Sequence, residues 1–566
     1  MFSVILVPFL PLLAALIVLV GDEDSRQRRA RIAAYPIGAA LLGAIVTLWY
    51  VATQGAITIR FYDPSSPATL AFPIGFYVDR LSAIMMVLIS GVGTIIYTYS
   101  VGYLYQDPHE TRYLSLIGFT TFVLLCMVSS GNLMMLFIFW QLLSYLLYIL
   151  AHNHAHAATL EGAFRTFTLL RVGDVAFLSA IVLAHSLYGT LEFQPLFVKA
   201  AETPVMLSPL PGWELNGATA VTLLLFIGGM SKSAQFPIHV WLPRSLYAPT
   251  PVHALLHAGI INAGGFLINR LAPLFVLSST TLHVAFIVGT LTAILGACMM
   301  LAQNDIKKTL GFSTIGQMGY MIMECGLGAF SLAVFHLIAH GLFKATVFLN
   351  CGNVIHKARQ EPHFPHHDHQ DQEEGFSRLT WSTGFVTTLF IPLLILLVTH
   401  GVLHIPLLES QGTVIFLFFI WITSSQAIMT LTRLRAVASW KVSSVMLLTL
   451  LFVVFVYLFA VESFTAFLYP DPHEVASYFK AAALPDWFFD LMIIMATLTT
   501  IAGWFYLYMR AHGRTVWMPS WVEGVRIRLY VLFMNRLYAD EVYQKLGGIV
   551  GRLLDRFDKS VRGWSR

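Results

Sequence analysis

The sequence is dominated by apolar runs that are long enough to cross a lipid bilayer. The hydrocarbon core of a bilayer is about 30 Å thick, so a helix that crosses it needs about 20 apolar residues. Runs of that length recur from Phe2 to Arg510. Of the 566 residues, 57% are hydrophobic and only 11% are charged, whereas a water-soluble globular protein carries about 25% charged residues. The chain is therefore predicted to be a multi-pass membrane protein.

The apolar runs predict an all-α fold with about 15 transmembrane helices. Helices are expected because a lipid-facing backbone must satisfy its N–H and C=O groups within one segment. The expected spans lie at 2–20, 33–53, 79–103, 114–130, 132–151, 163–188, 218–243, 252–273, 281–302, 309–327, 329–355, 381–400, 413–432, 442–461 and 488–510.

Basic residues in the short loops predict how the chain lies across the membrane. Lys and Arg concentrate in the cytoplasmic loops of membrane proteins. With the N-terminus outside, the odd-numbered loops hold most of them, and the opposite loops hold little beyond Arg60, Lys199 and Lys480. We therefore expect a multi-pass protein of the cell inner (cytoplasmic) membrane, with its N-terminus outside and its C-terminus inside.

The end of the chain, from 511 to 566, differs in character from the spans. Basic residues alternate there with Trp, Leu, Val and Ile. This pattern is typical of an amphipathic helix on the cytoplasmic membrane face. A solvated basic tail and a surface that docks a partner are the alternatives.

Ionisable side chains inside the expected spans are the strongest functional signal. A charge at the centre of a bilayer costs at least about 2.5 to 3.5 kcal/mol on insertion scales, so such residues mark ion or substrate pathways. Lys232 lies in the seventh span, beside Pro237 and the glycine pair 228–229, which can break the helix. A broken helix exposes backbone carbonyl groups to a polar cavity.

Two further spans carry histidines at helical spacing. His253 and His257 stand four residues apart in the eighth span, which puts both on one helix face. His336, His340 and Lys344 repeat the spacing in the eleventh span. A zinc site or a packing pair are alternatives for His253 and His257, but no third ligand lies within reach by sequence. We favour a proton relay, because histidine titrates near neutral pH.

The sixth span contains an acidic residue beside an arginine. Asp174 would be costly alone in the membrane, so we expect it to pair with Arg171 or to reach Lys232. Burial disfavours the charged form of a lysine, and a nearby carboxylate favours it. Movement of the acid would therefore switch whether Lys232 holds a proton, which is the chemistry of a pump.

No metal site is expected in this chain. The cysteines, Cys126, Cys298, Cys325 and Cys351, lie in apolar runs without metal-ligand spacing. The loop at 359–380 is rich in histidine and acidic residues. A metal-binding tract is one interpretation of that loop, but we favour a solvated loop, because the spacing defines no tetrahedral geometry.

Several motifs stand in order along the middle of the chain, at 229–237, 241–243, 249–258, 305–308 and 335–345. Together they resemble the proton-translocating antiporter-like family, which includes complex I subunit L and Mrp antiporter subunits. The resemblance implies that Lys232 is the central lysine of the seventh span and that His257 is the histidine of the eighth. It also implies that His336, His340 and Lys344 form a central hydrophilic axis that carries protons between half-channels.

Two features depart from the family pattern. The family places a glutamate after the tryptophan of its fifth-span motif, where this chain has Gln141 after Trp140. The twelfth span, 381–400, holds no lysine or glutamate. Glu324, near the end of the tenth span, is either a replacement for the missing acid or an interfacial residue.

The stretch 252–270 is similar to a sister branch of the family, the DabB membrane subunits of inorganic-carbon (CO2/bicarbonate) accumulation complexes. The resemblance implies a DabA-like cytoplasmic partner, a large zinc protein that resembles β-carbonic anhydrases. Lys307, Lys308, Arg526 and Arg528 are the candidates to face that partner. Zinc is expected in the partner and no cofactor in this chain, which is then an ion-translocating subunit and not an enzyme.

We therefore expect five regions: N-terminal spans at 1–75, an antiporter-like proton-translocation core at 76–358, the His-rich loop at 359–380, C-terminal spans at 381–510, and the basic amphipathic tail at 511–566. The expected function is conduction of protons, or of another cation such as Na+, coupled to inorganic-carbon uptake. An antiporter-like subunit of complex I or of an Mrp antiporter is one alternative. A non-transporting membrane scaffold for the partner is another.

Overall fold

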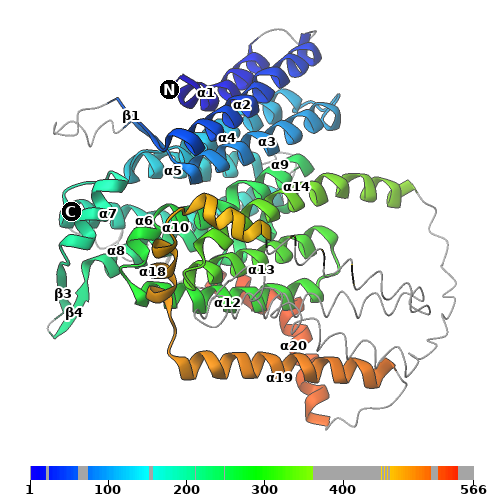
Figure 1. The fold of residues 1–566 in the computed structure, drawn as a ribbon. Coiled ribbons are helices and arrows are strands. Elements are labelled where there is room, and N and C mark those ends of the chain that lie inside the picture. The colour runs from blue at the N-terminus through cyan, green and yellow to red at the C-terminus, as the bar shows by residue number, and fades with distance from the viewer. Residues whose placement is uncertain are drawn as a thin grey trace, which may run out of the picture.

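The computed structural model is a bundle of long helices, many of them lying side by side (Figure 1). The described residues are 2–20, 25–61, 74–151, 157–210, 212–247, 249–360, 448, 452, 456, 459–511 and 520–545. Nine helices among them are long and apolar enough to cross a membrane, which confirms the expected all-α membrane fold. The number of about 15 spans stays a prediction, since 381–400, 413–432 and most of 442–461 lie outside the described residues.

The N-terminal half holds α1 to α7. These helices cover Phe2–Leu19, Arg26–Gln54, Arg80–Tyr103, Glu110–Val128, Leu133–Ala151, Ala157–Tyr188 and Phe193–Glu202. Between α2 and α3, β1 (Ile57–Arg60) pairs antiparallel with β2 (Gly75–Val78). The sequence does not predict this pair, because strands of four residues are too short for a clear periodicity.

The C-terminal half begins with a second strand pair, β3 (Met206–Leu210) and β4 (Trp213–Asn216). The helices that follow are α8 (Gly217–Lys232), η3 (Ile238–Tyr247), α9 (Thr250–Ala258), η4 (Ile260–Asn262), α10 (Ala263–Arg270), α11 (Ala272–Phe275), α12 (Ser279–Ala302), α13 (Ile306–Gly326), α14 (Phe330–Gln360), α18 (Pro472–Ala482), α19 (Asp486–Ala511), α20 (Ser520–Met534) and η6 (Arg536–Tyr538). The segment Phe459–Leu468 and residues 539–545 are also helical.

The seventh span is interrupted directly after Lys232, where α8 ends. Pro237 has no N–H with which to continue a helix. The carbonyl of Ser233, four residues earlier, instead accepts a hydrogen bond from Gln235 Nε2 at 3.0 Å. The expected break is therefore present, but it follows Lys232, and the glycine pair 228–229 lies inside the intact helix.

The eighth span is interrupted at Gly259, between α9 and η4. Asn262 Nδ2 donates to the carbonyl of Ala258 at 2.8 Å, so a backbone group freed by the break keeps a partner. Ser233, which lies in the first break, donates from its hydroxyl to the carbonyl of Ile261 at 2.7 Å. The two interrupted helices therefore touch at their breaks.

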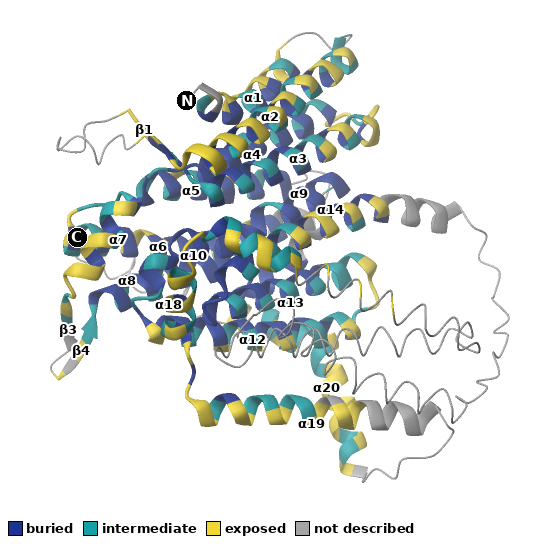
Figure 2. Ribbon diagram, viewed as in Figure 1, coloured by how far each residue is buried: buried dark blue, intermediate teal, exposed yellow. Residues whose placement is uncertain are grey.

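Burial is highest around these breaks (Figure 2). Across Thr250–Arg270, 94% of the most apolar stretch is buried, against 28% in α2 and 6% in the described part of α19. Polar residues in the eighth span therefore face protein, and ionisable groups there can be shielded from lipid.

Replacement of Gly264 tests the contact between the breaks. A Cβ atom at Gly264 would lie 2.3 Å from the carbonyl oxygen of Gly229. We expect Gly264→Ala to lower the free energy of unfolding by about 1 to 3 kcal/mol, the usual cost of overpacking, measured as a lower melting temperature of the purified protein. Gly38→Ala is the control, because no atom lies within 4 Å of its added Cβ. Equal melting temperatures of the two variants would contradict this close approach.

Candidate functional site

Lys232 is fully buried at the end of α8. Its ammonium group donates to the carbonyl oxygen of Trp140 at 3.2 Å and to the hydroxyl of Ser144. It also lies 4.9 Å from the centre of the Trp140 ring, a cation–π geometry. All three partners are neutral, and a neutral amine could keep the same hydrogen bonds. The site can therefore accept either protonation state of the lysine.

Asp174, on α6, also contacts Trp140. One oxygen, Oδ1, accepts from the indole Nε1 of Trp140 at 2.9 Å, and the other, Oδ2, pairs with Arg171 Nη2 at 2.8 Å. Of the two partners that the sequence left open for Asp174, the structure shows Arg171 in direct contact. Trp140 therefore contacts both groups, since its indole bonds to Asp174 and its carbonyl oxygen to Lys232.

Gln141 faces Arg171 and not Lys232. Arg171 Nη1 donates to Gln141 Oε1, and the guanidinium carbon lies 4.4 Å from the centre of the Phe167 ring. We call this group the lysine cluster, and its members are Gln141, Ser144, Trp140, Arg171, Asp174 and Lys232. Arg171 connects the polar members of the cluster, because it contacts both the amide of Gln141 and the carboxylate of Asp174.

A close approach of α6 to α8 builds this cluster. A Cβ atom added at Gly173 would lie 1.8 Å from Ser231 Oγ, and one at Gly228 would lie 3.0 Å from Phe177 Cβ. Only glycines allow two helices to pack this tightly there. The glycine next to Asp174 therefore brings the acid into the same layer as Lys232.

A second group forms between α9 and α14. His336, His340 and Lys344 follow one another at four-residue spacing on α14, and His253 and His257 lie opposite on α9. The ring of Phe348 stacks on His257, with centroids 4.3 Å apart and planes 9° apart, and it lies 6.0 Å from His253. We call His253, His257, His336, His340 and Lys344 the histidine ladder. Phe348 follows Lys344 on α14 at the same four-residue spacing.

The deeper part of the ladder is buried. His340 and Lys344 are almost fully enclosed, and Lys344 Nζ donates to the carbonyl of Leu310 at 3.3 Å. His257 lies within electrostatic reach of both residues. The ladder therefore joins α9 to α14 through ionisable groups and not only through apolar packing.

Glu324 closes the other end of the ladder. His336 Nδ1 lies 3.1 Å from each carboxylate oxygen of Glu324, and His336 Nε2 lies 3.0 Å from Gln317 Oε1. In this structure Glu324 therefore pairs with His336. None of its recorded contacts is with Lys232, so it does not directly replace the glutamate of the fifth-span motif.

Several buried polar atoms near the breaks have no hydrogen-bond partner among the described residues. They are both ring nitrogens of His257 and of His340, Oδ1 of Asn262, Oε1 of Gln235 and Nε2 of His239. Buried polar groups are normally paired with protein or with ordered water. This distribution suits a hydrated path better than a dry core.

The candidates for partner contact lie at the surface of α20 and α13. Arg526 and Arg528 are exposed on α20, and Arg526 pairs with Glu523 at 3.1 Å. Lys307 and Lys308 stand half-exposed in the first turn of α13. Among the described residues there is no group of three or more His, Cys, Asp or Glu that could hold a metal. The His-rich loop at 359–380 lies outside that set.

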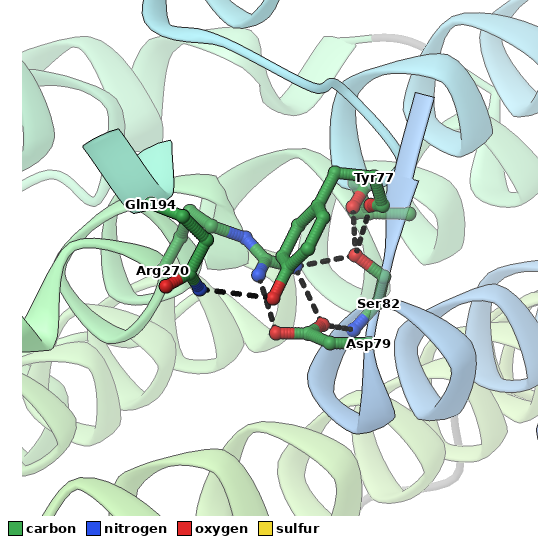
Figure 3. A network of polar contacts seen from close by, with 6 residues as sticks. Tyr77, Asp79, Ser82, Gln194 and Arg270 are labelled. Carbon is green, nitrogen blue, oxygen red and sulfur yellow. Dashed lines mark hydrogen bonds and ion pairs between the residues drawn. The ribbon is translucent and has the colours of Figure 1, made fainter. Parts of the chain in front are cut away.

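A buried ion pair that the sequence did not predict lies at the end of α10 (Figure 3). Arg270 Nη1 lies 2.7 Å from Asp79 Oδ2 and Nη2 lies 3.0 Å from Oδ1. Arg270 also donates to Ser82, which donates to the carbonyl of Val128 at 2.6 Å. Nearby, Gln194 donates to the Tyr77 hydroxyl. The network ties the second half of the broken eighth span to the start of α3.

Comparison with known proteins identifies the family. The profile "NADH:quinone oxidoreductase/Mrp antiporter, TM" matches residues 130–424, and "NADH-Ubiquinone oxidoreductase (complex I), chain 5 N-terminus" matches 65–114. A Halothiobacillus neapolitanus protein named "Probable inorganic carbon transporter subunit DabB1" is 38% identical over 552 residues, 96% of each chain. The chain belongs to the antiporter-like family of complex I and Mrp membrane subunits.

Other antiporter-like proteins match over less of their own length. NADH-quinone oxidoreductase subunit L of Neisseria meningitidis is 32% identical over 397 residues, which are 68% of this chain and 58% of that protein. The structure of the Mrp complex from Dietzia sp. DQ12-45-1b has a TM-score of 0.54 at 22% identity, over 98% of this chain and 60% of that chain. The similarity to the Mrp complex structure supports the fold alone. The antiporter-like profile at 130–424 contains the whole lysine cluster and the whole histidine ladder.

The ion pair at Asp79 can be tested by removal of one charge. Arg270 is 3% exposed, so Asp79→Asn would leave a buried guanidinium without its counter-ion, while asparagine still caps α3. We expect a loss of about 3 kcal/mol in the free energy of unfolding, measured by thermal melting. The double variant Asp79→Asn with Arg270→Met should recover part of this loss.

Glu523→Gln is the matched control for that experiment. Its pair with Arg526 is 60% and 64% exposed, and exposed pairs contribute about 1 kcal/mol or less. If Asp79→Asn melted as Glu523→Gln does, the buried pair would not hold α10 to α3.

Proposed function

We propose that this chain conducts protons, or another cation such as Na+, as the membrane subunit of an inorganic-carbon uptake complex. The observation that carries the proposal is the set of buried ionisable groups at the touching helix breaks, several of which have no hydrogen-bond partner within the described part of the chain. A membrane protein keeps such groups where ions or protons pass. The near full-length similarity to DabB1 supports the choice of complex.

On the proposed path, Lys232 exchanges protons with the histidine ladder across the two breaks. The neutral partners of Lys232 allow its amine to load and unload. Imidazoles at four-residue spacing then pass the proton along α14 toward His336 and Glu324. Asp174 acts through Trp140 and favours the charged form of the lysine.

The proposed direction of flow is inward, with the N-terminus outside and the C-terminus in the cytoplasm, as the basic loops predict. A membrane potential of 100 mV supplies about 2.3 kcal/mol for each charge moved. One or two charges could therefore hold CO2 hydration in a partner away from equilibrium. The proposed partner is a DabA-like cytoplasmic protein that contains the zinc, and this chain would be no enzyme itself.

Contact with that partner is assigned to the exposed basic residues on the proposed cytoplasmic side. Arg526 and Arg528 are exposed on α20, and Lys307 and Lys308 are half-exposed on α13, so these residues offer positive charge at the surface. Such surface charge steers association more than it sets affinity. The tail is proposed to lie along the membrane face.

An antiporter-like subunit of a complex I or Mrp assembly is the second candidate, favoured by the similarity to subunit L. Gln141 and the expected twelfth span, which lacks lysine and glutamate, speak against it. A non-transporting scaffold is disfavoured because the lysine cluster and the ladder are both complete in the described part of the chain.

Lys232→Ala is expected to abolish inorganic-carbon accumulation while the complex still assembles, because the change removes the only proton-carrying group at the end of α8. The measurement is uptake of labelled inorganic carbon in cells, with assembly checked by co-purification of the partner. Lys480→Ala, at an exposed lysine of α18, is the control and should be neutral. Normal uptake by an assembled Lys232→Ala complex would refute the proposed path.

Gln141→Glu tests whether position 141 and Asp174 compete for Arg171. A carboxylate at 141 would compete with Asp174 for the guanidinium, because Arg171 already binds both positions. Asp174 would then be freer to stabilise charged Lys232, so we expect proton release and uptake to slow at least several-fold. Asp174→Asn should also reduce uptake, through loss of the charged form. A faster Gln141→Glu variant combined with an inert Asp174→Asn variant would contradict this account.

A further inference from the structure

One buried histidine near the first break belongs to neither the lysine cluster nor the histidine ladder. His239 lies in the first turn of η3 and is 1% exposed. Its ring stacks on Phe236, with centroids 5.5 Å apart, and its Nδ1 lies 3.1 Å from the carbonyl oxygen of Pro237. The ring is therefore held in one orientation from two sides.

The partner of Nδ1 decides which tautomer His239 adopts. A carbonyl oxygen can only accept, so Nδ1 carries the hydrogen and Nε2 carries a free lone pair. That Nε2 atom is buried and has no hydrogen-bond partner among the described residues. His239 thus presents its basic nitrogen to the interior, beyond the break that follows Lys232.

Between Lys232 and His239 the chain holds another buried polar side chain. Gln235 is fully buried, and its Nε2 donates to the carbonyl of Ser233 at 3.0 Å. Its Oε1, like Nε2 of His239, is without a partner in the described part of the chain. Polar atoms therefore continue along the non-helical stretch and do not stop at the lysine.

The C-terminal segment, residues 520–545, covers this region from outside. The Tyr543 hydroxyl donates to the carbonyl oxygen of Pro237 at 3.1 Å. The same oxygen accepts the hydrogen bond from Nδ1 of His239. Asp540, one helical turn before Tyr543, pairs with Arg536 Nη1 at 3.6 Å and also lies within electrostatic reach of His239. Gln303 Nε2 donates to the carbonyls of Phe533 and Met534, at 3.4 Å each, and so holds the segment against the end of α12.

We propose that His239 is a further proton-carrying residue, which exchanges protons between Lys232 and the face covered by the C-terminal segment, and that Tyr543 closes this exchange point. The proposal rests on the proposed function, because it extends the same path by one step. In that step Nε2 accepts a proton from the path, and the imidazolium then releases the Nδ1 proton to water on that face. Asp540 supplies a nearby negative charge that stabilises the imidazolium while it is loaded.

The alternative is that His239 only satisfies the carbonyl of Pro237. His239→Asn separates the two roles, because the asparagine amide stands close to the position of Nδ1 and can still donate to that carbonyl, but it cannot carry a proton. His239→Ala removes both properties. A structural role predicts that asparagine restores what alanine loses, whereas a proton-carrying role predicts that both variants fail alike.

The experiment measures proton flux in membrane vesicles that contain the full complex, driven by an imposed pH gradient and followed with a pH-sensitive dye. We expect His239→Asn and His239→Ala to assemble and to lose at least ten-fold in flux. Lys232→Ala is measured in the same vesicles. Loss of flux in Lys232→Ala with normal flux in His239→Asn would overturn this inference alone, whereas normal flux in Lys232→Ala would overturn the proposed function.

Tyr543→Phe gives a second test that leaves the histidine in place. The change removes one hydroxyl, so the C-terminal segment loses its hydrogen bond to Pro237, and we expect proton leak without inorganic carbon to rise at least two-fold. Tyr538→Phe is the control, because the Tyr538 hydroxyl bonds to Asn535 within the same segment. Equal leak in the two tyrosine variants would overturn the assignment of Tyr543 as the closing residue.

Discussion

The burial of the Lys232 amine at the end of an interrupted helix is the interaction on which the rest of the site depends. An uninterrupted helix would pair its own backbone groups, whereas a break leaves backbone groups inside the membrane that need other partners. The break after Lys232 frees Ser233 to bond with the break in the eighth span. Because Gly229 and Gly264 let the two backbones approach, one interruption stabilises the other.

No carboxylate among the described residues is in direct contact with Lys232, and Trp140 contacts both the amine and Asp174. Two unit charges 4 Å apart attract by about 4 kcal/mol at an effective dielectric constant of 20, which would hold a proton firmly on the amine. Here the recorded partners of the amine are a carbonyl, a hydroxyl and an aromatic face. Asp174 contacts the indole of the same tryptophan. The acid can therefore bias the lysine without locking it.

The sequence predicts the groups whose members lie close along the chain. The four-residue spacing of His336, His340 and Lys344 is a local property of one helix, and so is the pairing of Arg171 with Asp174. The same spacing also contains Phe348, which was overlooked because an aromatic residue in an apolar span carries no signal of its own. The break after Lys232 was predicted from Pro237, although its exact place was not, because the glycine pair 228–229 serves close packing and remains helical.

Contacts between distant parts of the chain could not be predicted in this way. Asp79 and Arg270 are separated by 191 positions. No motif around either residue indicates that the two form an ion pair. Asp79 is the residue before α3, where an acidic side chain caps the helix and needs no distant partner. Similarly, nothing in the sequence near Pro237 indicates that Tyr543 reaches it. Such pairs depend on how the helices pack, which a single sequence does not reveal.

The C-terminal segment connects two features that would otherwise be independent. Its first part, α20, carries the exposed Arg526 and Arg528, and its last part reaches Pro237 beside His239. Between them, Arg536, Leu537 and Tyr538 all have positive φ angles, from 51° to 62°, a conformation that costs about 1 to 2 kcal/mol for each residue other than glycine. Strain of this kind persists only while the surroundings hold it. The strained turn therefore links α20 directly to the residues that contact Pro237.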